Sequence, residues 1–261
     1  MIQQTIQKIE KKLNINFRVA IALAKRDFLK YRRDRTRLIT SMFQSIMWVA
    51  IFGIMLTNVS IVAAGMIVQA ILFMGIFSGI SIVQDRMFGF HKEIMVAPIS
   101  RTTITLGKAI GGMMIACIQG FILLGISSAL GFFGYDLWLF LRIFLAIPII
   151  FLVSFLTVSL GNLIATKMSD FHKMQFLMTF LVMPMFFTSG AIIDFVGMPI
   201  YYFTLINPIT YAVDAIRWIM LYGTPAASFG LPFMIDILII SVISLIFILI
   251  AAYIFRKSES V

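Results

Sequence analysis

Apolar residues fill long uncharged stretches of the chain, and short polar segments separate these stretches. No charged residue occurs from 38 to 84 or from 109 to 135. Such runs are typical of membrane-spanning helices, each of which needs about 20 apolar residues. The first run is too long for one span, and the polar cluster at 57–60 divides it. The pattern predicts six spans, at 38–57, 61–84, 106–133, 143–166, 174–193 and 233–255.

The segment 17–36 has the pattern of an amphipathic helix. Its apolar residues recur at spacings of three and four, and basic residues fill most of the other face. This periodicity predicts a helix that lies in the membrane interface, preceded by a polar tail at 1–16. The predicted apolar stripe is Phe17, Ile21, Ala24, Phe28 and Tyr31, and the basic face includes Arg18, Lys25, Arg26, Lys30, Arg32 and Arg33.

The region 194–232, between the fifth and sixth predicted spans, is apolar but interrupted. Residues 195–213 carry no charge, yet Pro199, Asn207 and Pro208 lie among them. A lipid-facing helix with these breaks would leave backbone groups unsatisfied, whereas re-entrant elements tolerate them. We expect two short helices that dip into the outer leaflet and return.

The basic residues lie mostly on one side of this predicted topology. Eleven of the 21 Lys and Arg residues occur in the first 37 positions. With six spans and a cytoplasmic N-terminus, 19 of the 21 lie inside, and only Arg142 and Arg217 lie outside. Cytoplasmic loops are enriched in this way, so both termini are predicted to be cytoplasmic. Acidic residues near the outer surface are expected to be solvated loop charges: Asp136, Asp194 and Asp236.

Composition supports a membrane protein with one domain. The 261 residues are 61% hydrophobic, with a mean hydropathy of +1.03, whereas soluble domains are about 45–50% apolar. Residues 1–261 leave no room for a separate soluble domain. The net charge of +10 is concentrated at the N-terminus, which favours a membrane-surface segment over a nucleic-acid site.

Motifs for catalysis or nucleotide binding are absent from the sequence. Gly107-Lys108 lacks the glycine and the hydroxyl residue of a phosphate loop, and His91 and His172 have no partners at metal-ligand spacing. We therefore expect no catalytic residue, metal or bound cofactor. The neutral polar residues within the spans are expected mostly to form helix–helix hydrogen bonds, and Gly75…Gly79 and Gly107…Gly111 to permit close helix packing.

Three segments resemble the permease subunits of type-2 ABC exporters, and the similarity extends over most of the chain. The first segment is 85–112, and the second is TSGAII at 188–193. The third is 205–223, where the matching residues are Asn207, Pro208, Tyr211, Asp214 and Arg217. In the first segment the matching residues are Arg86, Gly89, Glu93, Ala97, Pro98, Ser100, Arg101, Gly107 and Lys108. The resemblance assigns six of these to ATPase coupling: Arg86, Gly89, Glu93, Ala97, Pro98 and Arg101. The link at 193–196 departs from the family pattern.

The resemblance implies a half-transporter of the plasma membrane. Two copies would pair, and two separate ATPase subunits, which use ATP and Mg, would dock on a coupling helix at 85–101. The helix at 17–36 would be a second contact with the ATPase or with anionic lipid. Spans two and five would line the export path, and the region 195–229 would form its outer gate. Within this family, the chain most resembles multidrug permeases of the daunorubicin-resistance type. The resemblance implies that the substrate is a drug, a lipid or a lipid-linked glycan.

Other classes of membrane protein remain open from the residues alone. A lipid-modifying enzyme would need acid–base or metal-binding residues at one depth, and an ion-coupled carrier would need charges in its spans or inverted repeats. A membrane partner in a signalling assembly would need neither.

Overall fold

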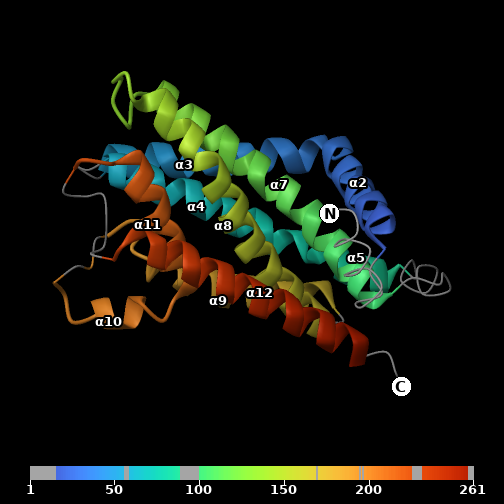
Figure 1. The fold of residues 1–261 in the computed structure, drawn as a ribbon. Coiled ribbons are helices and arrows are strands. Elements are labelled where there is room, and N and C mark those ends of the chain that lie inside the picture. Colours follow the sequence, from blue (N-terminus) through green and yellow to red (C-terminus); the bar gives the residue numbers. More distant parts are fainter. Residues whose placement is uncertain are drawn as a thin grey trace, which may run out of the picture.

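A computed structural model describes most of the chain, and Figure 1 shows its helices. The described residues are 16–55, 59–88, 100–168, 170–193, 195, 197–224 and 231–257. Every regular element within these ranges is a helix, which confirms the all-α fold class. The helices are α2 (Phe17–Arg33), α3 (Arg35–Met55), α4 (Val59–Ser78), α5 (Ile80–Met87), α7 (Arg101–Ala129), α8 (Leu139–Lys167), α9 (Phe171–Phe187), α10 (Tyr201–Thr204), α11 (Pro208–Met220) and α12 (Phe233–Lys257).

Four stretches of helix are long and apolar enough to cross a membrane. They are Val59–Met87, formed by α4 and α5, Thr102–Ala129 of α7, Leu139–Lys167 of α8 and Phe233–Ile254 of α12. These correspond to predicted spans two, three, four and six. The helix α7 begins five residues before the predicted start at 106, because Ser100 caps it: the Ser100 hydroxyl accepts a hydrogen bond from the Thr103 amide at 3.3 Å.

Predicted spans one and five are helical as well, as α3 and α9. Their apolar portions, Ile39–Ile51 and Phe171–Phe187, are shorter than the about 20 residues that cross the hydrocarbon core. Helix length and composition therefore give four spans among the described residues.

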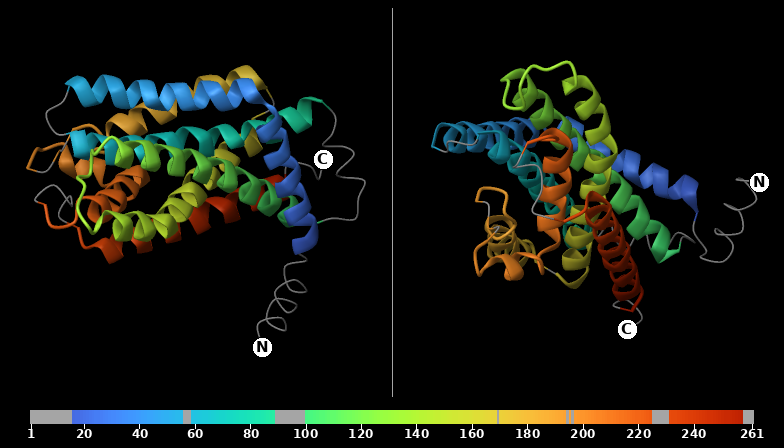
Figure 2. Two further views of the ribbon diagram at one scale, coloured as in Figure 1. Left: turned by 90° about the horizontal axis from the view of Figure 1, so that it is seen from above. Right: turned by 60° about the vertical axis from the view of Figure 1, so that its left-hand side comes forward.

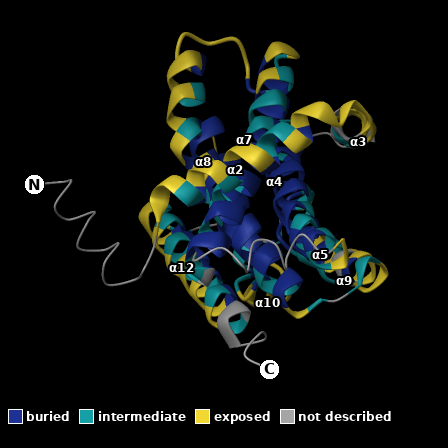
Figure 3. Cartoon of the chain, turned by 90° about the vertical axis from the view of Figure 1, so that its right-hand side faces the viewer, coloured by how far each residue is buried: buried dark blue, intermediate teal, exposed yellow. Residues whose placement is uncertain are grey.

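The helix α4 lies at the centre of the bundle, where it packs against α3, α7, α8 and α11. Figure 3 shows it almost entirely buried. Gly75 of α4 and Gly79, which joins α4 to α5, permit close contact with α8: a Cβ atom at Gly79 would lie 2.5 Å from the carbonyl oxygen of Gly161, and one at Gly75 would overlap the Thr157 side chain. The predicted packing role of Gly75 and Gly79 is confirmed.

Helices α3 and α12 lie at the periphery of the bundle (Figure 3). Large apolar side chains on the outer face of α3 are exposed, among them Ile39, Phe43 and Ile51. Figure 2 shows that α2 crosses the end of the bundle at a steep angle to the other helices. The chain therefore has a lipid-compatible surface along its length and a separate helix across one end.

Only part of the buried polar side chains within the bundle form helix–helix hydrogen bonds. Gln119 Nε2 donates to the Ser41 carbonyl oxygen at 3.1 Å, and Thr157 Oγ1 donates to the Ile71 carbonyl oxygen at 3.4 Å. The side chains of Ser159 and Asn162 are buried, and their polar atoms have no hydrogen-bond partner among the described residues. The expectation is thus confirmed for Gln119 and Thr157 and wrong for Ser127, Ser128, Ser159 and Asn162.

Candidate functional site

The helix α2 packs on the first turns of α7 at one end of the bundle, which we call the charged end. Ala20 and Ala24 of α2 are buried against Gly107 and Gly111 of α7. A Cβ atom at Gly107 would lie 2.9 Å from the Ala20 carbonyl oxygen, and one at Gly111 would lie 3.1 Å from Ala24 Cα. The two glycines, four residues apart on one face of α7, therefore form the seat of α2.

The buried face of α2 differs from the predicted apolar stripe. Ala24 and Tyr31 of that stripe are buried within the bundle, whereas Phe17 and Ile21 are exposed, at 37% and 59%. Asp27 lies on the buried face instead. The small residues Ala20 and Ala24 meet the glycines of α7, and the larger residues Phe17 and Ile21 face outward. The basic residues Arg18, Lys25 and Arg32 are exposed, and Phe28 is half-buried against the core.

Four charged side chains meet where α2, α5 and α7 converge, and we call them the four-charge cluster: Arg26, Asp27, Asp85 and Lys108. Arg26 Nη2 lies 2.8 Å from Asp85 Oδ2 and 2.9 Å from Asp27 Oδ1. Lys108 Nζ lies 3.3 Å from Asp27 Oδ2 and contacts Asp85 Oδ2 directly. Two acids face two bases, so the cluster is neutral as a whole.

The cluster is buried except for its arginine. The side chains of Asp27, Asp85 and Lys108 are at most 7% exposed, whereas that of Arg26 is 40% exposed. Burial alone would lower the pKa of Arg26, but the facing carboxylates of Asp27 and Asp85 outweigh it and raise that pKa. Lys108 Nζ also donates to Ser81 Oγ at 3.2 Å. The cluster therefore joins three helices through charge-assisted hydrogen bonds.

Arg86 joins α5 to a fourth helix. Its Nη1 atom donates to the carbonyl oxygens of Thr166 at 2.9 Å and Met168 at 3.2 Å, at the C-terminus of α8. The last carbonyls of a helix have no partner within the helix and carry partial negative charge, so a guanidinium satisfies them well. Asp85 and Arg86 thus tie the end of α5 to α2, α7 and α8.

The segment between α5 and α7 contains most of the residues assigned to ATPase coupling. Gly89, Glu93, Ala97 and Pro98 lie outside the described residues, and Arg101 is the first residue of α7. The start of α7 is fixed twice, by the Ser100 cap and by a hydrogen bond from the Asn16 amide to Thr103 Oγ1 at 3.0 Å. Both flanks of this segment are therefore anchored to the bundle.

The residues assigned to an outer gate lie at the opposite end of the bundle, around the C-terminus of α9. Asn207 caps α11, accepting from the Ile209 amide at 3.0 Å, and Pro208 is the first residue of that helix. The Asn207 amide donates to the Met185 carbonyl oxygen and to Thr188 Oγ1. Tyr211 donates to the Leu205 carbonyl oxygen at 2.7 Å. These residues hold the segments α9, α10 and α11 together.

Arg217 and Asp214 are buried on α11, at 2% and 0% exposed. Arg217 Nη2 donates to the Gly190 carbonyl oxygen at 2.6 Å, so it holds the turn after α9. Among the acids expected in solvated loops, Asp136 is exposed and pairs with Arg142 at 3.0 Å, and Asp194 lies outside the described residues. Asp236 is fully buried, because the first turn of α12 packs against α11. The expectation for Asp236 was therefore wrong.

Asn207→Ala is expected to lower the free energy of unfolding by about 1–2 kcal/mol, because the α11 cap and the bonds to α9 are both lost. Asn207→Ser, which keeps a capping hydroxyl and loses only the bonds to α9, should cost less. Denaturant unfolding of the full chain in detergent measures both. Equal stability of the alanine variant and the unaltered chain would contradict the capping role.

Sequence reasoning did not identify Asp27, Asp85 and Lys108 as one site. The sequence did contain an indication of this site: Asp85 directly follows one uncharged run, and Lys108 directly precedes the next. Two consecutive antiparallel helices place such residues at the same depth. Among the described residues, no three His, Cys, Asp or Glu side chains lie close enough together to hold a metal ion.

Comparison with known proteins identifies the family. The model of the family described as ABC-2 type transporter matches residues 18–221. A transport permease, ycf38, of Cyanophora paradoxa is 25% identical over 212 residues, which are 76% of this chain and 72% of the relative. Nodulation protein J of Rhizobium meliloti is 27% identical over 177 residues, 66% of this chain and 65% of the relative. The chain belongs to the ABC-2 type transporter family.

Proposed function

We propose that this chain is the transmembrane subunit of an ATP-driven exporter. Two copies pair to form the path for an amphipathic drug, lipid or lipid-linked glycan. Two separate ATPase subunits, which use ATP and Mg, supply the energy. Membership of a transporter family, with relatives named as transport permeases, supports transport over an enzymatic reaction.

The observation that carries the proposal is the anchoring of both flanks of the segment 88–100. Asp85 ties the end of α5 to α2 and α7, and Arg86 ties it to α8. A plain connector between two helices needs no such bonds. A segment through which the ATPase moves the permease needs such bonds. When the two ends of that segment are displaced, the bonds make several packed helices move together.

The coupling helix in this proposal is 85–101, and its ATPase contacts are Arg86, Gly89, Glu93, Ala97, Pro98 and Arg101. Residues 17–36 form a second contact, with the exposed Arg18, Lys25 and Arg32 directed to the ATPase or to anionic lipid. The neutral four-charge cluster lies directly between these two contacts. A movement of either contact would then reach the other.

The proposed topology has six spans in the plasma membrane, with both termini in the cytoplasm. It counts α3 and α9 as spans, because the bias of basic residues then agrees with the positive-inside rule. The helices of spans two and five line the export path. The outer region 195–229, with α10 and α11, is re-entrant and gates the outer end of the path.

Co-purification tests the proposal directly. The chain is expressed with the ATPase encoded beside it, and the complex is isolated by a tag on the ATPase. We expect the chain to co-purify at one copy per ATPase. Absence of the chain from the purified ATPase would remove the exporter assignment.

The same complex tests the coupling helix. Glu93→Ala and Pro98→Ala should each lower coupled ATPase activity roughly tenfold, since they alter the contact through which the two proteins are coupled. Membrane insertion and yield should stay unchanged. Lys173→Ala, at an exposed position of α9, serves as the control. Full coupled activity in both variants would assign coupling to another segment.

A further inference from the structure

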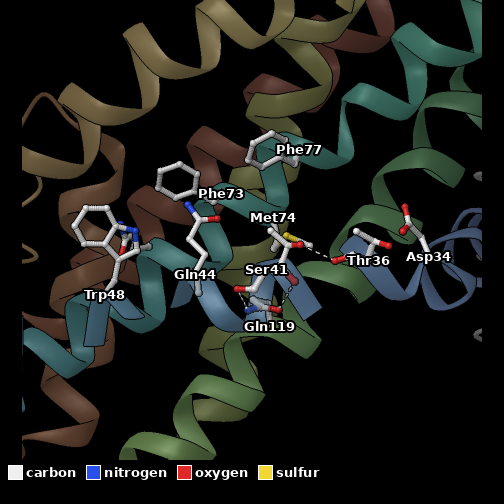
Figure 4. A pocket seen from close by; sticks show the side chains of 12 residues that line it. Asp34, Thr36, Ser41, Gln44, Trp48, Phe73, Met74, Phe77 and Gln119 are labelled. Carbon is white, nitrogen blue, oxygen red and sulfur yellow. Dashed lines mark hydrogen bonds between the residues drawn. The ribbon is translucent and has the colours of Figure 1, made fainter. Parts of the chain in front are cut away.

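A pocket of about 380 Å³ lies between α3, α4 and α7, and Figure 4 shows its lining. Its volume lies in the range of small-molecule sites in proteins. It begins near Asp34 at the charged end and extends along α3 to Trp48. The pocket therefore lies alongside the central helix α4, within the depth of the bundle.

The polar face of α3 is turned into this pocket. Thr36, Thr40, Gln44 and Trp48 are spaced four residues apart, so they lie on one face of the helix, and all four line the pocket. The exposed side chains Ile39 and Phe43 lie on another face. Hydrocarbon disfavours polar side chains, so their direction toward the pocket agrees with a membrane surface on the other side.

Some polar groups in the pocket are already satisfied. Gln119 and Ser41 bond each other, and Thr40 Oγ1 donates to the Thr36 carbonyl oxygen within its own helix at 2.8 Å. Gln44 and Gln69 differ from these. Neither side chain forms a hydrogen bond with any residue that the structure describes, although Gln69 is only 4% exposed. Both side chains line the pocket, so a ligand there would supply the hydrogen-bond partner that their amides lack among the described residues.

The chemistry of the lining defines the ligand. Glutamine amides donate and accept hydrogen bonds without carrying charge, and Trp48, Phe73 and Phe77 offer aromatic faces beside them. Among the described residues of the lining, Asp34, at the charged end, is the single charged one. A ligand that matches this surface has neutral hydrogen-bonding groups next to a planar apolar part.

We propose that this pocket binds uncharged planar amphipathic molecules, with Gln44 and Gln69 as the hydrogen-bonding residues that select them. As the entry site of an exported substrate, the pocket rests on the function proposed above. As a binding site, it requires only this chain. A lipid acyl chain is the other possible occupant, but it could not satisfy the two amides.

Binding of Nile red, an uncharged planar dye, to the full chain in lipid nanodiscs tests the proposal without the ATPase. Fluorescence polarisation is measured against empty nanodiscs of the same lipid, which corrects for partition into the bilayer. We expect a saturable component with the chain. Absence of this saturable component would contradict the proposed binding site. The co-purification experiment, which tests the exporter assignment, does not depend on this result.

Substitutions then assign the binding to the two glutamines. Gln44→Met and Gln69→Met keep the length of the side chain and remove its amide, so each should weaken Nile red binding roughly fivefold. Gln175→Met, the same change at an exposed position of α9, should have no effect. Unchanged binding in either pocket variant, or equal weakening by the control, would overturn the proposal. An acyl-chain site would give the first of these results.

Gln44→Glu introduces a charge, and it tests the pocket through an expected gain in binding as well as a loss. Gln44 is exposed at the pocket, so Gln44→Glu should fold, and its carboxylate should weaken Nile red binding. The same variant should strengthen binding of the cationic dye rhodamine 6G by several-fold. No change in the relative binding of the two dyes would place both of them elsewhere.

Discussion

Lys108→Met is expected to lower the free energy of unfolding by about 3–5 kcal/mol. The substitution keeps the length of the side chain but removes the ammonium group, which leaves the carboxylates of Asp27 and Asp85 buried with Arg26 as their remaining cation. Arg26 is 40% exposed, and it cannot neutralise two buried acids. Denaturant unfolding of the full chain in detergent measures the loss.

Two further variants show whether the loss comes from charge. Lys108→Met combined with Asp85→Asn should be more stable than Lys108→Met alone, since one uncompensated carboxylate is removed with the ammonium. Lys173→Met removes an exposed lysine and should change stability by less than about 0.5 kcal/mol. If the double variant is the less stable one, the four-charge cluster does not hold these helices by charge.

Gly65→Ala is expected to cost about 1–3 kcal/mol of stability. A Cβ atom at Gly65 would overlap the carbonyl oxygen of Ala191 and lie 2.7 Å from its carbonyl carbon. The obstruction is backbone, so the turn after α9 has to move. That turn also receives the hydrogen bond from Arg217, which would be strained by the same movement. Unfolding in detergent measures the effect.

Gly125→Ala is the matched control for this prediction. Gly125 lies within α7, and an added Cβ atom there meets no other atom within 4 Å. Because alanine favours helix over glycine, this variant should gain up to about 1 kcal/mol. The two substitutions are chemically identical and should have opposite signs. A gain in stability from both would show that α4 and the 188–193 turn are not in close contact.

The helices themselves were predictable because hydropathy determines them locally. A run of about 20 apolar residues in lipid must satisfy its own backbone hydrogen bonds, and a helix does so within the segment. The ends of helices were less predictable. Ser100 and Asp170 cap α7 and α9 through side chains that a hydropathy window treats as ordinary polar residues.

The contacts between helices were the part that sequence reasoning predicted least well. Periodicity shows which residues of 17–36 share a face, but what covers that face depends on α7, far along the chain. Asp27 was therefore overlooked, because its partner Lys108 is distant in sequence. The same holds for Asp236, which is close to a predicted loop yet buried against α11. Among the residues assigned by resemblance, Asn207 and Arg217 have defined contacts, and those at 89–99 await a functional test.

The seat of α2 on α7 constrains the order in which the protein can be assembled. Asn16 and its partner Thr103 are 87 residues apart, so α2 leaves the ribosome well before its binding surface exists. At about 5–20 residues per second, that delay is roughly 4–17 s. During this time Asp27 lacks Lys108, and the charged residues of α2 keep this helix out of the bilayer core. Although α2 is synthesised before α5 and α7, it therefore docks after them, and it completes the charged end only when both are already in place.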